Sequence, residues 1–138
     1  MSHFKHKTPI QLRFKDLDAM GHVNNANHLT YIELARTDYF NEVLGSLVNW
    51  STMGIILARV EVDFKHPILL NDKLTVLTKC TRIGNKSFDL SYRIVKSDRG
   101  ESIEMARLFT VMVCFDYVKK MPIAFPPEWR EVIEAYEK

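Results

Sequence analysis

One long stretch of helical periodicity, in a chain that otherwise alternates, most constrains the fold of this protein. From residue 26 to residue 47, apolar side chains recur at spacings of three and four, which predicts a helix with one apolar face. The members of this stripe are Leu29, Ile32, Ala35, Tyr39, Phe40, Val43 and Leu47. Such a helix needs an apolar surface to pack on, and the rest of the chain must supply it.

The segments around the helix read as strands. Apolar and polar residues alternate at residues 10–15 and 60–65, and Gly84-Asn85 predicts a tight hairpin between strands at 74–83 and 86–96, with a further turn at 97–100. A last strand at 102–116 is apolar on both faces, so we expect a second subunit to cover the face that the helix leaves open. A short C-terminal helix is predicted to begin at Pro126-Pro127-Glu128. The prediction is an α+β fold in which one long helix packs on an antiparallel sheet.

Length and charge exclude several classes of function. The 138 residues suffice for one domain, and 19 Lys and Arg against 17 Asp and Glu are interspersed without a basic block, so no nucleic-acid partner is expected. The N-terminal MSHFKHKTPIQ lacks the apolar run of a signal peptide and no segment is long and apolar enough for a membrane span. We therefore expect a cytoplasmic protein without a membrane partner.

The two cysteines do not suggest a metal site. Cys80 and Cys114 lie in apolar segments, and neither has a second Cys or a His at metal-ligand spacing. We interpret both as buried free thiols, with a catalytic cysteine and a distant histidine as the alternative. No metal or cofactor is expected.

The stretch DLDAMGHVNN, which ends where the helix begins, carries the candidate chemistry. A helix N-terminus presents unsatisfied amides that can polarise a carbonyl oxygen. Asp18 lies a few residues before those amides, where it could attack the carbonyl carbon or deprotonate a water that does. A thioester suits this site better than an amide, because a thiol with a pKa of about 8.5 leaves with little acid assistance.

Each of these residues also has a structural interpretation. Asp18 could cap the turn beside Gly21, and His22 could bond to backbone. Asn24 or Asn25 suits the N-cap of the helix, so the functional hypothesis for Asn25 concerns its backbone amide.

Two acidic residues near the site have structural explanations as well. Asp16 is expected to order the loop that carries Asp18. Glu33 is expected to form an ion pair, with Arg36 three residues later as one candidate partner.

Two stretches, RFKDLDAMGHVNN at residues 13–25 and YIELAR at residues 31–36, resemble the signature of the hydroxybenzoyl-CoA thioesterase-like acyl-CoA thioesterases. The later segments FKHP, NDKL and CFD also fit that family, so the resemblance covers nearly the whole chain. It implies the hotdog fold, a long central helix wrapped by a five-stranded antiparallel sheet, as a single domain over residues 1–138. It further implies a homodimer or homotetramer with active sites at the dimer interface.

The resemblance also implies roles for individual residues. Asp18 corresponds to the catalytic carboxylate, and the backbone amide of Asn25 to the group that polarises the thioester carbonyl. His22 is a further catalytic candidate. Substrate contacts are expected from Asn24, Tyr31 and Glu33, and the expected substrate is an acyl-CoA.

Three alternatives stay open. The first is a thioesterase acting on acyl carrier protein, although Met20 stands where plant-type enzymes of that kind have a catalytic Asn. The second is a noncatalytic acyl-CoA-binding protein of the same fold. The third is a hydratase, whose usual helix motif has no match around His28.

Overall fold

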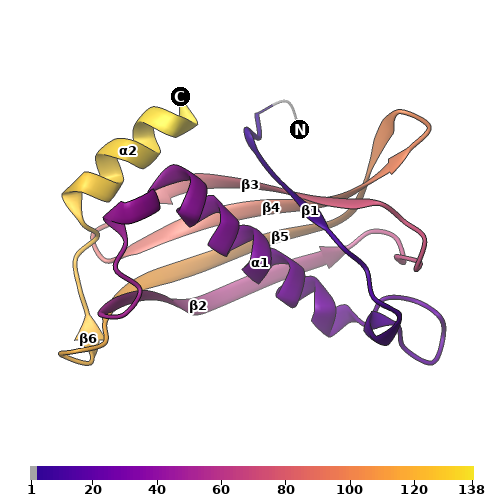
Figure 1. Ribbon diagram of the computed structural model, residues 1–138, viewed down its shortest axis with the longest axis horizontal. Coiled ribbons are helices and arrows are strands. Elements are labelled where there is room, and N and C mark those ends of the chain that lie inside the picture. Colours follow the sequence, from indigo (N-terminus) through magenta and orange to yellow (C-terminus); the bar gives the residue numbers. More distant parts are fainter. Residues whose placement is uncertain (1–2) are drawn as a thin grey trace.

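A computed structural model describes residues 3–138, which form an antiparallel sheet with two α-helices (Figure 1). The strands are β1 (His6–Ile10), β2 (Met53–Phe64), β3 (Leu74–Ile83), β4 (Ser87–Asp98), β5 (Glu101–Asp116) and β6 (Met121–Pro122). Their order is β1-β3-β4-β5-β2, with β6 paired to β5. The antiparallel sheet packed on a helix is confirmed. The expected count of five strands is wrong, because β6 is too short to leave an alternating pattern.

The predicted strand at residues 10–15 is also wrong. β1 pairs with β3 from His6 opposite Thr78 to Ile10 opposite Leu74, where β3 begins. Residues after Ile10 therefore have no strand to pair with, and the chain turns into the 3-10 helix η1 (Phe14–Asp16). Phe14, predicted to face the core, is 80% exposed.

The helix α1 (Asn25–Val43) crosses one face of the sheet (Figure 1). Leu29 and Leu47, at the two ends of the predicted stripe, are exposed. His28 is the buried side chain of the first turn, and Leu47 belongs to the 3-10 helix η2 (Gly45–Leu47) after α1 has ended. The central stripe is buried as predicted and comprises Ile32, Ala35, Tyr39 and Phe40.

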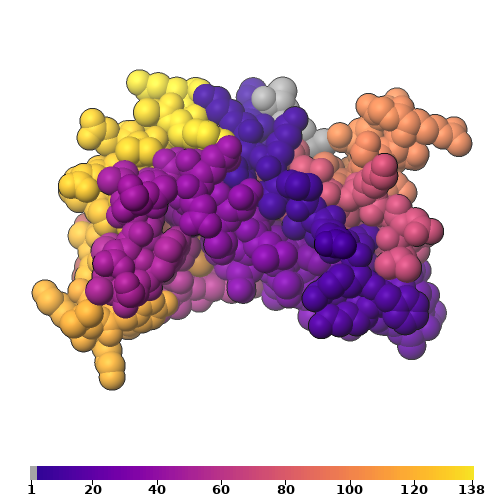
Figure 2. Space-filling view, viewed as in Figure 1, coloured from indigo at the N-terminus to yellow at the C-terminus, as the bar shows by residue number. Residues whose placement is uncertain are grey.

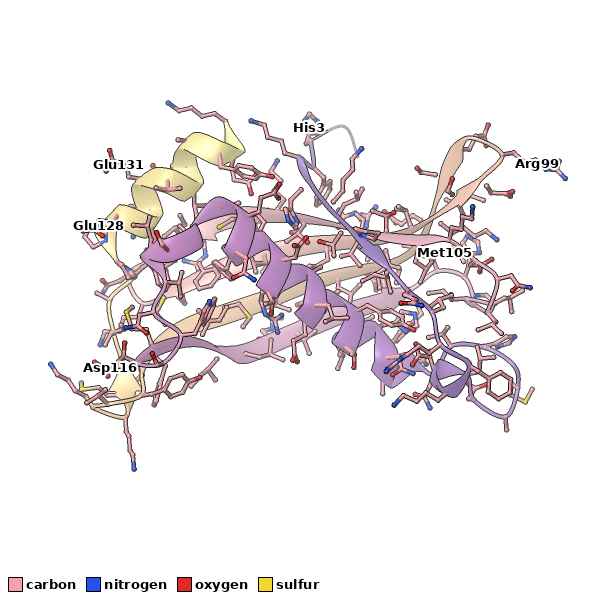
Figure 3. The ribbon with its side chains drawn as sticks, in the orientation of Figure 1. His3, Arg99, Met105, Asp116, Glu128 and Glu131 are labelled. Carbon is pink, nitrogen blue, oxygen red and sulfur yellow. The ribbon has the colours of Figure 1, made fainter. Side chains whose placement is uncertain are left out.

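Both predicted hairpin turns are present. Gly84-Asn85 joins β3 to β4, and the Gly84 amide donates to the Ser87 carbonyl at 2.7 Å. Arg99 and Gly100, with φ of 53° and 81°, join β4 to β5. Arg99 marks the tip of this hairpin in Figure 3, away from both helices.

The C-terminal helix α2 (Pro127–Glu137) is confirmed. Its buried residues are Trp129 and Ile133, and the Trp129 ring packs against Phe125 and Phe40. Glu128 and Glu131 point away from the sheet (Figure 3). The helix thereby closes the core beside the C-terminal half of α1.

Two surfaces of the sheet remain apolar and uncovered. On β5, the face toward α1 is buried, whereas Phe109, Val111 and Val113 on the opposite face are half-buried. β2 is an edge strand, and its Ile56 and Leu57 are 40% and 42% exposed. The double apolar character predicted for the last strand is confirmed.

Candidate active site

A recess of about 310 Å³ lies where the N-terminus of α1 meets the end of β2. The loop between η1 and α1 forms one wall, and the residues that follow Phe64 form the other. This loop is the indigo corner of the molecule in Figure 2, beside the segment near residue 70. The lining residues are Asp18, His22, Val23, Asn25, His28, Phe64, Lys65, His66, Pro67 and Ile68.

The Asp18 carboxylate is held by its own loop. Its Oδ1 accepts hydrogen bonds from the backbone amides of Met20 at 2.9 Å and His22 at 3.3 Å. The Asp18 amide donates to the His22 carbonyl at 2.8 Å, and Gly21, with φ of 82°, makes the turn between them. The side chain is therefore turn-forming, as the structural interpretation predicted, and it also lines the recess.

Asp16 orders this loop, as predicted. It is 1% exposed, its Oδ2 accepts from the Tyr31 hydroxyl at 2.8 Å, and Arg13 donates to it from backbone and side chain. Burial by itself would raise the pKa of Asp16, but the hydrogen bonds from Tyr31 and Arg13 outweigh burial and lower it. An ionised Asp16 thus ties the loop to α1.

The first turn of α1 leaves one amide unpaired in a residue that lines the recess. Asn24 is the N-cap, and its Oδ1 accepts from the Ala26 amide at 2.9 Å. The Asn27 amide donates to the Asn24 carbonyl at 2.9 Å. The Asn25 amide has no acceptor within residues 3–138, since first-turn amides lack intrahelical partners, and Asn25 lines the recess.

The opposite wall is fixed by β5. The amides of Lys65 and His66 both donate to the Met105 carbonyl, at 2.9 and 3.1 Å. Met105 is labelled in Figure 3 on the same side of the view as the loop. A bond from the Val23 amide to the Ile68 carbonyl, 2.8 Å, ties the two walls together.

Three histidines line the recess, of which the sequence singled out His22. His28 is 3% exposed, and burial lowers the pKa of its imidazole. Hydrogen bonding to the backbone of Asn24 and Asn25 raises this pKa, but by less than burial lowers it. His66 is exposed on the β2 side. The signal that could have identified His28 is its position three residues after Asn25, on the face of α1 that turns toward the sheet.

All three predicted substrate contacts, Asn24, Tyr31 and Glu33, lie outside the recess lining. Tyr31 is buried, and burial is the main reason that the pKa of its hydroxyl is raised. The hydrogen bond to Asp16 raises this pKa further. Glu33 is exposed on α1, beside a separate groove lined also by Arg36 and Leu57. Glu33 and Arg36 form no ion pair with each other, because Arg36 is buried and donates to the Tyr92 hydroxyl at 3.1 Å.

The cysteines are buried free thiols, as predicted. Burial raises the pKa of Cys80 and of Cys114 to about 12. Neither thiol lines the recess. A thiolate nucleophile is therefore disfavoured at both positions.

Two further findings concern the part of the chain that the structure describes. Residues 3–138 contain no group of three or more His, Cys, Asp and Glu placed to hold a metal ion. Over the same residues, no helix combines the length and the apolar character that a membrane crossing requires.

Comparison with known proteins gives consistent matches. The family model of the thioesterase-like superfamily matches residues 12–133. Long-chain acyl-CoA thioesterase FadM of Escherichia coli K12 is 28% identical over 96% of this chain and 99% of its own. Acyl-CoA thioesterase YbgC of Haemophilus influenzae is 24% identical over 87% of this chain and 88% of its own. A Thermus thermophilus thioesterase, solved with coenzyme A and Zn, superposes with a TM-score of 0.84 at 34% identity, covering 99% of this chain and 97% of that one.

Proposed function

This chain belongs to the thioesterase-like superfamily, and we propose that it hydrolyses acyl-CoA thioesters to a free carboxylic acid and CoA. The observation that carries the proposal is the recess in which a carboxylate, Asp18, and a free helix N-terminal amide, Asn25, line the same space. The names of the relatives support the acyl-CoA substrate class.

In the proposed mechanism, the two groups act on opposite ends of the thioester carbonyl. The Asn25 amide, aided by the partial positive charge of the α1 N-terminus, stabilises the oxygen as it gains negative charge. Asp18 acts on the carbon, either as nucleophile or by deprotonating a water. CoA leaves as a thiolate, so the site needs no strong general acid.

The remaining residue assignments stay part of the proposal. His22 lines the recess and would act as an auxiliary catalytic group. Asn24 would shape the substrate site as the N-cap that leaves the Asn25 amide free. Tyr31 would support the site through Asp16, and Glu33 would contact the substrate from the separate groove that it lines with Arg36 and Leu57.

We further propose that the chain is a single hotdog domain, with α1 as the central helix, that assembles into homodimers or homotetramers. The open edge of β2 and the half-buried outer face of β5 support this assembly, because both are apolar surfaces without a cover. A cytoplasmic location belongs to the same proposal, supported by two free thiols, which fit a reducing compartment.

A thiol-release assay across acyl-CoA chain lengths tests the function, with Asp18→Asn as the diagnostic variant. We expect the variant to lose at least about 10²-fold in kcat, the usual contribution of a catalytic acid–base group. Asp98→Asn, at the tip of the distant β4–β5 hairpin, is the matched control and should retain full activity. Full activity in Asp18→Asn would remove Asp18 from the mechanism, and binding of acyl-CoA without any turnover would indicate a noncatalytic protein.

A further inference from the structure

The imidazole of His28 is buried in the wall of the recess that holds Asp18. The ring stands edge-on to the Phe64 ring, with centroids 4.9 Å apart and planes at 90°. Its Nδ1 is sealed from solvent and makes no hydrogen bond of standard geometry within residues 3–138, although the backbone of Asn24 and Asn25 lies beside the ring. Because the residue lines the recess, Nε2 is the ring nitrogen left to face it. A water or ligand in the recess would therefore meet this ring at Nε2.

His28 is neutral at pH 7, because burial lowers its pKa below the ordinary value of 6.5. A neutral imidazole carries a proton on one nitrogen and a lone pair on the other. The titratable groups that face it from the loop, from α1 and from the end of β2 are Asp18, His22, Tyr31, Lys65 and His66.

Asp18 and His28 line one recess but suit different steps of a hydrolysis. The Oδ1 of Asp18 is fixed by two backbone amides, which leaves Oδ2 outside those bonds. An imidazole is the stronger base of the two side-chain types, since their reference pKa values are about 6.5 and about 3.9. We propose that His28 takes the proton of the hydrolytic water and that Asp18 is the nucleophile, an assignment that rests on the proposed thioesterase function.

Hydrolysis then proceeds in two steps, acyl transfer to Asp18 and release of the acid by water. A carboxylate oxygen of Asp18 attacks the thioester carbon, the C–S bond breaks and CoA leaves as a thiolate. The acyl group then remains on Asp18 as a mixed anhydride. Water then attacks the acyl carbon, its proton passes to His28, and the bond between that carbon and the Asp18 oxygen breaks. The products are the free acid, the Asp18 carboxylate and a His28 imidazolium, which returns its proton to solvent.

The variant His28→Asn separates these steps. Acylation does not need His28, so rapid mixing with an acyl-CoA should release a burst of one thiol per site. Turnover should then continue at least about 10²-fold more slowly than in the wild type, as for loss of a general base. The wild type should show a pH-dependent kcat that rises through a midpoint below 6.5, and His28→Asn should lack this acid limb.

His6→Asn is the matched control, because His6 is equally buried but lies on β1 against Asp38 and Glu42 of α1. It should lose stability yet keep the acid limb and show no burst. A merely structural role for His28 would make the two histidine variants behave alike.

The inference is wrong if folded His28→Asn keeps the wild-type kcat and acid limb. Loss of activity in Asp18→Asn would then leave the proposed function intact, whereas a wild type that releases no thiol from any acyl-CoA would remove that function itself. If His28→Asn does not fold, His28→Gln replaces it, and NMR of the wild type with ¹³C-labelled histidine gives the titration of His28. A His28 midpoint that differs from the acid limb of kcat would also overturn the assignment.

Discussion

At the scale of single residues, Asp16 and Asp18 show how neighbours in one loop take separate tasks. Asp16 is buried and bonded to Tyr31 and Arg13, whereas Asp18 is exposed to the recess and bonded only to its own loop. The first carboxylate holds the loop on α1, and the second is free to meet a ligand. The sequence predicted the loop-ordering role of Asp16 and the turn-forming role of Asp18, whereas the catalytic role of Asp18 stays a prediction.

Tyr31→Phe tests the role of Asp16. Removing the hydroxyl leaves a buried carboxylate oxygen without its partner, which should lower the free energy of unfolding at pH 7 by about 1–3 kcal/mol. The folded-state pKa of Asp16 lies below its ordinary value of 3.8, so its ionised form stabilises the fold above that value. This contribution is lost as the pH falls through the folded-state pKa.

The measurement is urea unfolding of both proteins from pH 7 down into the acid range below pH 3.8, as far as both proteins stay folded without urea. The difference between wild type and Tyr31→Phe should shrink as the pH falls. A difference that is constant with pH would show that the hydroxyl acts through packing alone.

At the scale of elements, the N-terminus of α1 joins stability to the site. The same N-cap that satisfies the Ala26 amide leaves the amide of Asn25, a residue that lines the recess, without an acceptor. The loop, the first turn of α1 and the end of β2 are held together by backbone bonds, including Val23 to Ile68. A change in the cap is therefore expected to affect both folding and turnover.

Asn24→Ala should lower the free energy of unfolding by about 1 kcal/mol, the usual cost of losing an N-cap side chain. It should also lower kcat, because the first turn that positions the Asn25 amide frays. Asn24→Ser, which keeps a capping oxygen, is the control and should restore most of both quantities. If Asn24→Ala lost stability but kept its kcat, the cap would not position the catalytic amide.

At the scale of the whole molecule, the sheet is covered on one face by α1 and α2 and left open elsewhere (Figure 1). The open parts are the outer face of β5 and the edge of β2, with exposed Ile56 and Leu57. An open strand edge with apolar side chains favours association with another strand. A pocket that opens between copies would then depend on assembly.

Leu57→Lys tests this dependence. A charge on the β2 edge should shift the protein from the proposed dimer or tetramer to monomer in sedimentation velocity, and thioesterase activity should fall with it. Val118→Lys is the matched control, because Val118 is 71% exposed in the turn between β5 and β6. It should change neither quantity, and an oligomeric Leu57→Lys protein would place the interface elsewhere.

The sequence by itself determined the long helix, the hairpin at Gly84-Asn85, the last strand and the residues of the loop before α1. These are local patterns, in which periodicity or turn chemistry acts between near neighbours. Only the tertiary structure decided where β1 ends, since that depends on where β3 begins. It also decided that Arg36 forms a hydrogen bond with Tyr92 rather than an ion pair with Glu33. It alone also brought His66 to the recess of Asp18, because the wall that follows β2 comes from a segment whose contact with the loop leaves no trace in linear spacing.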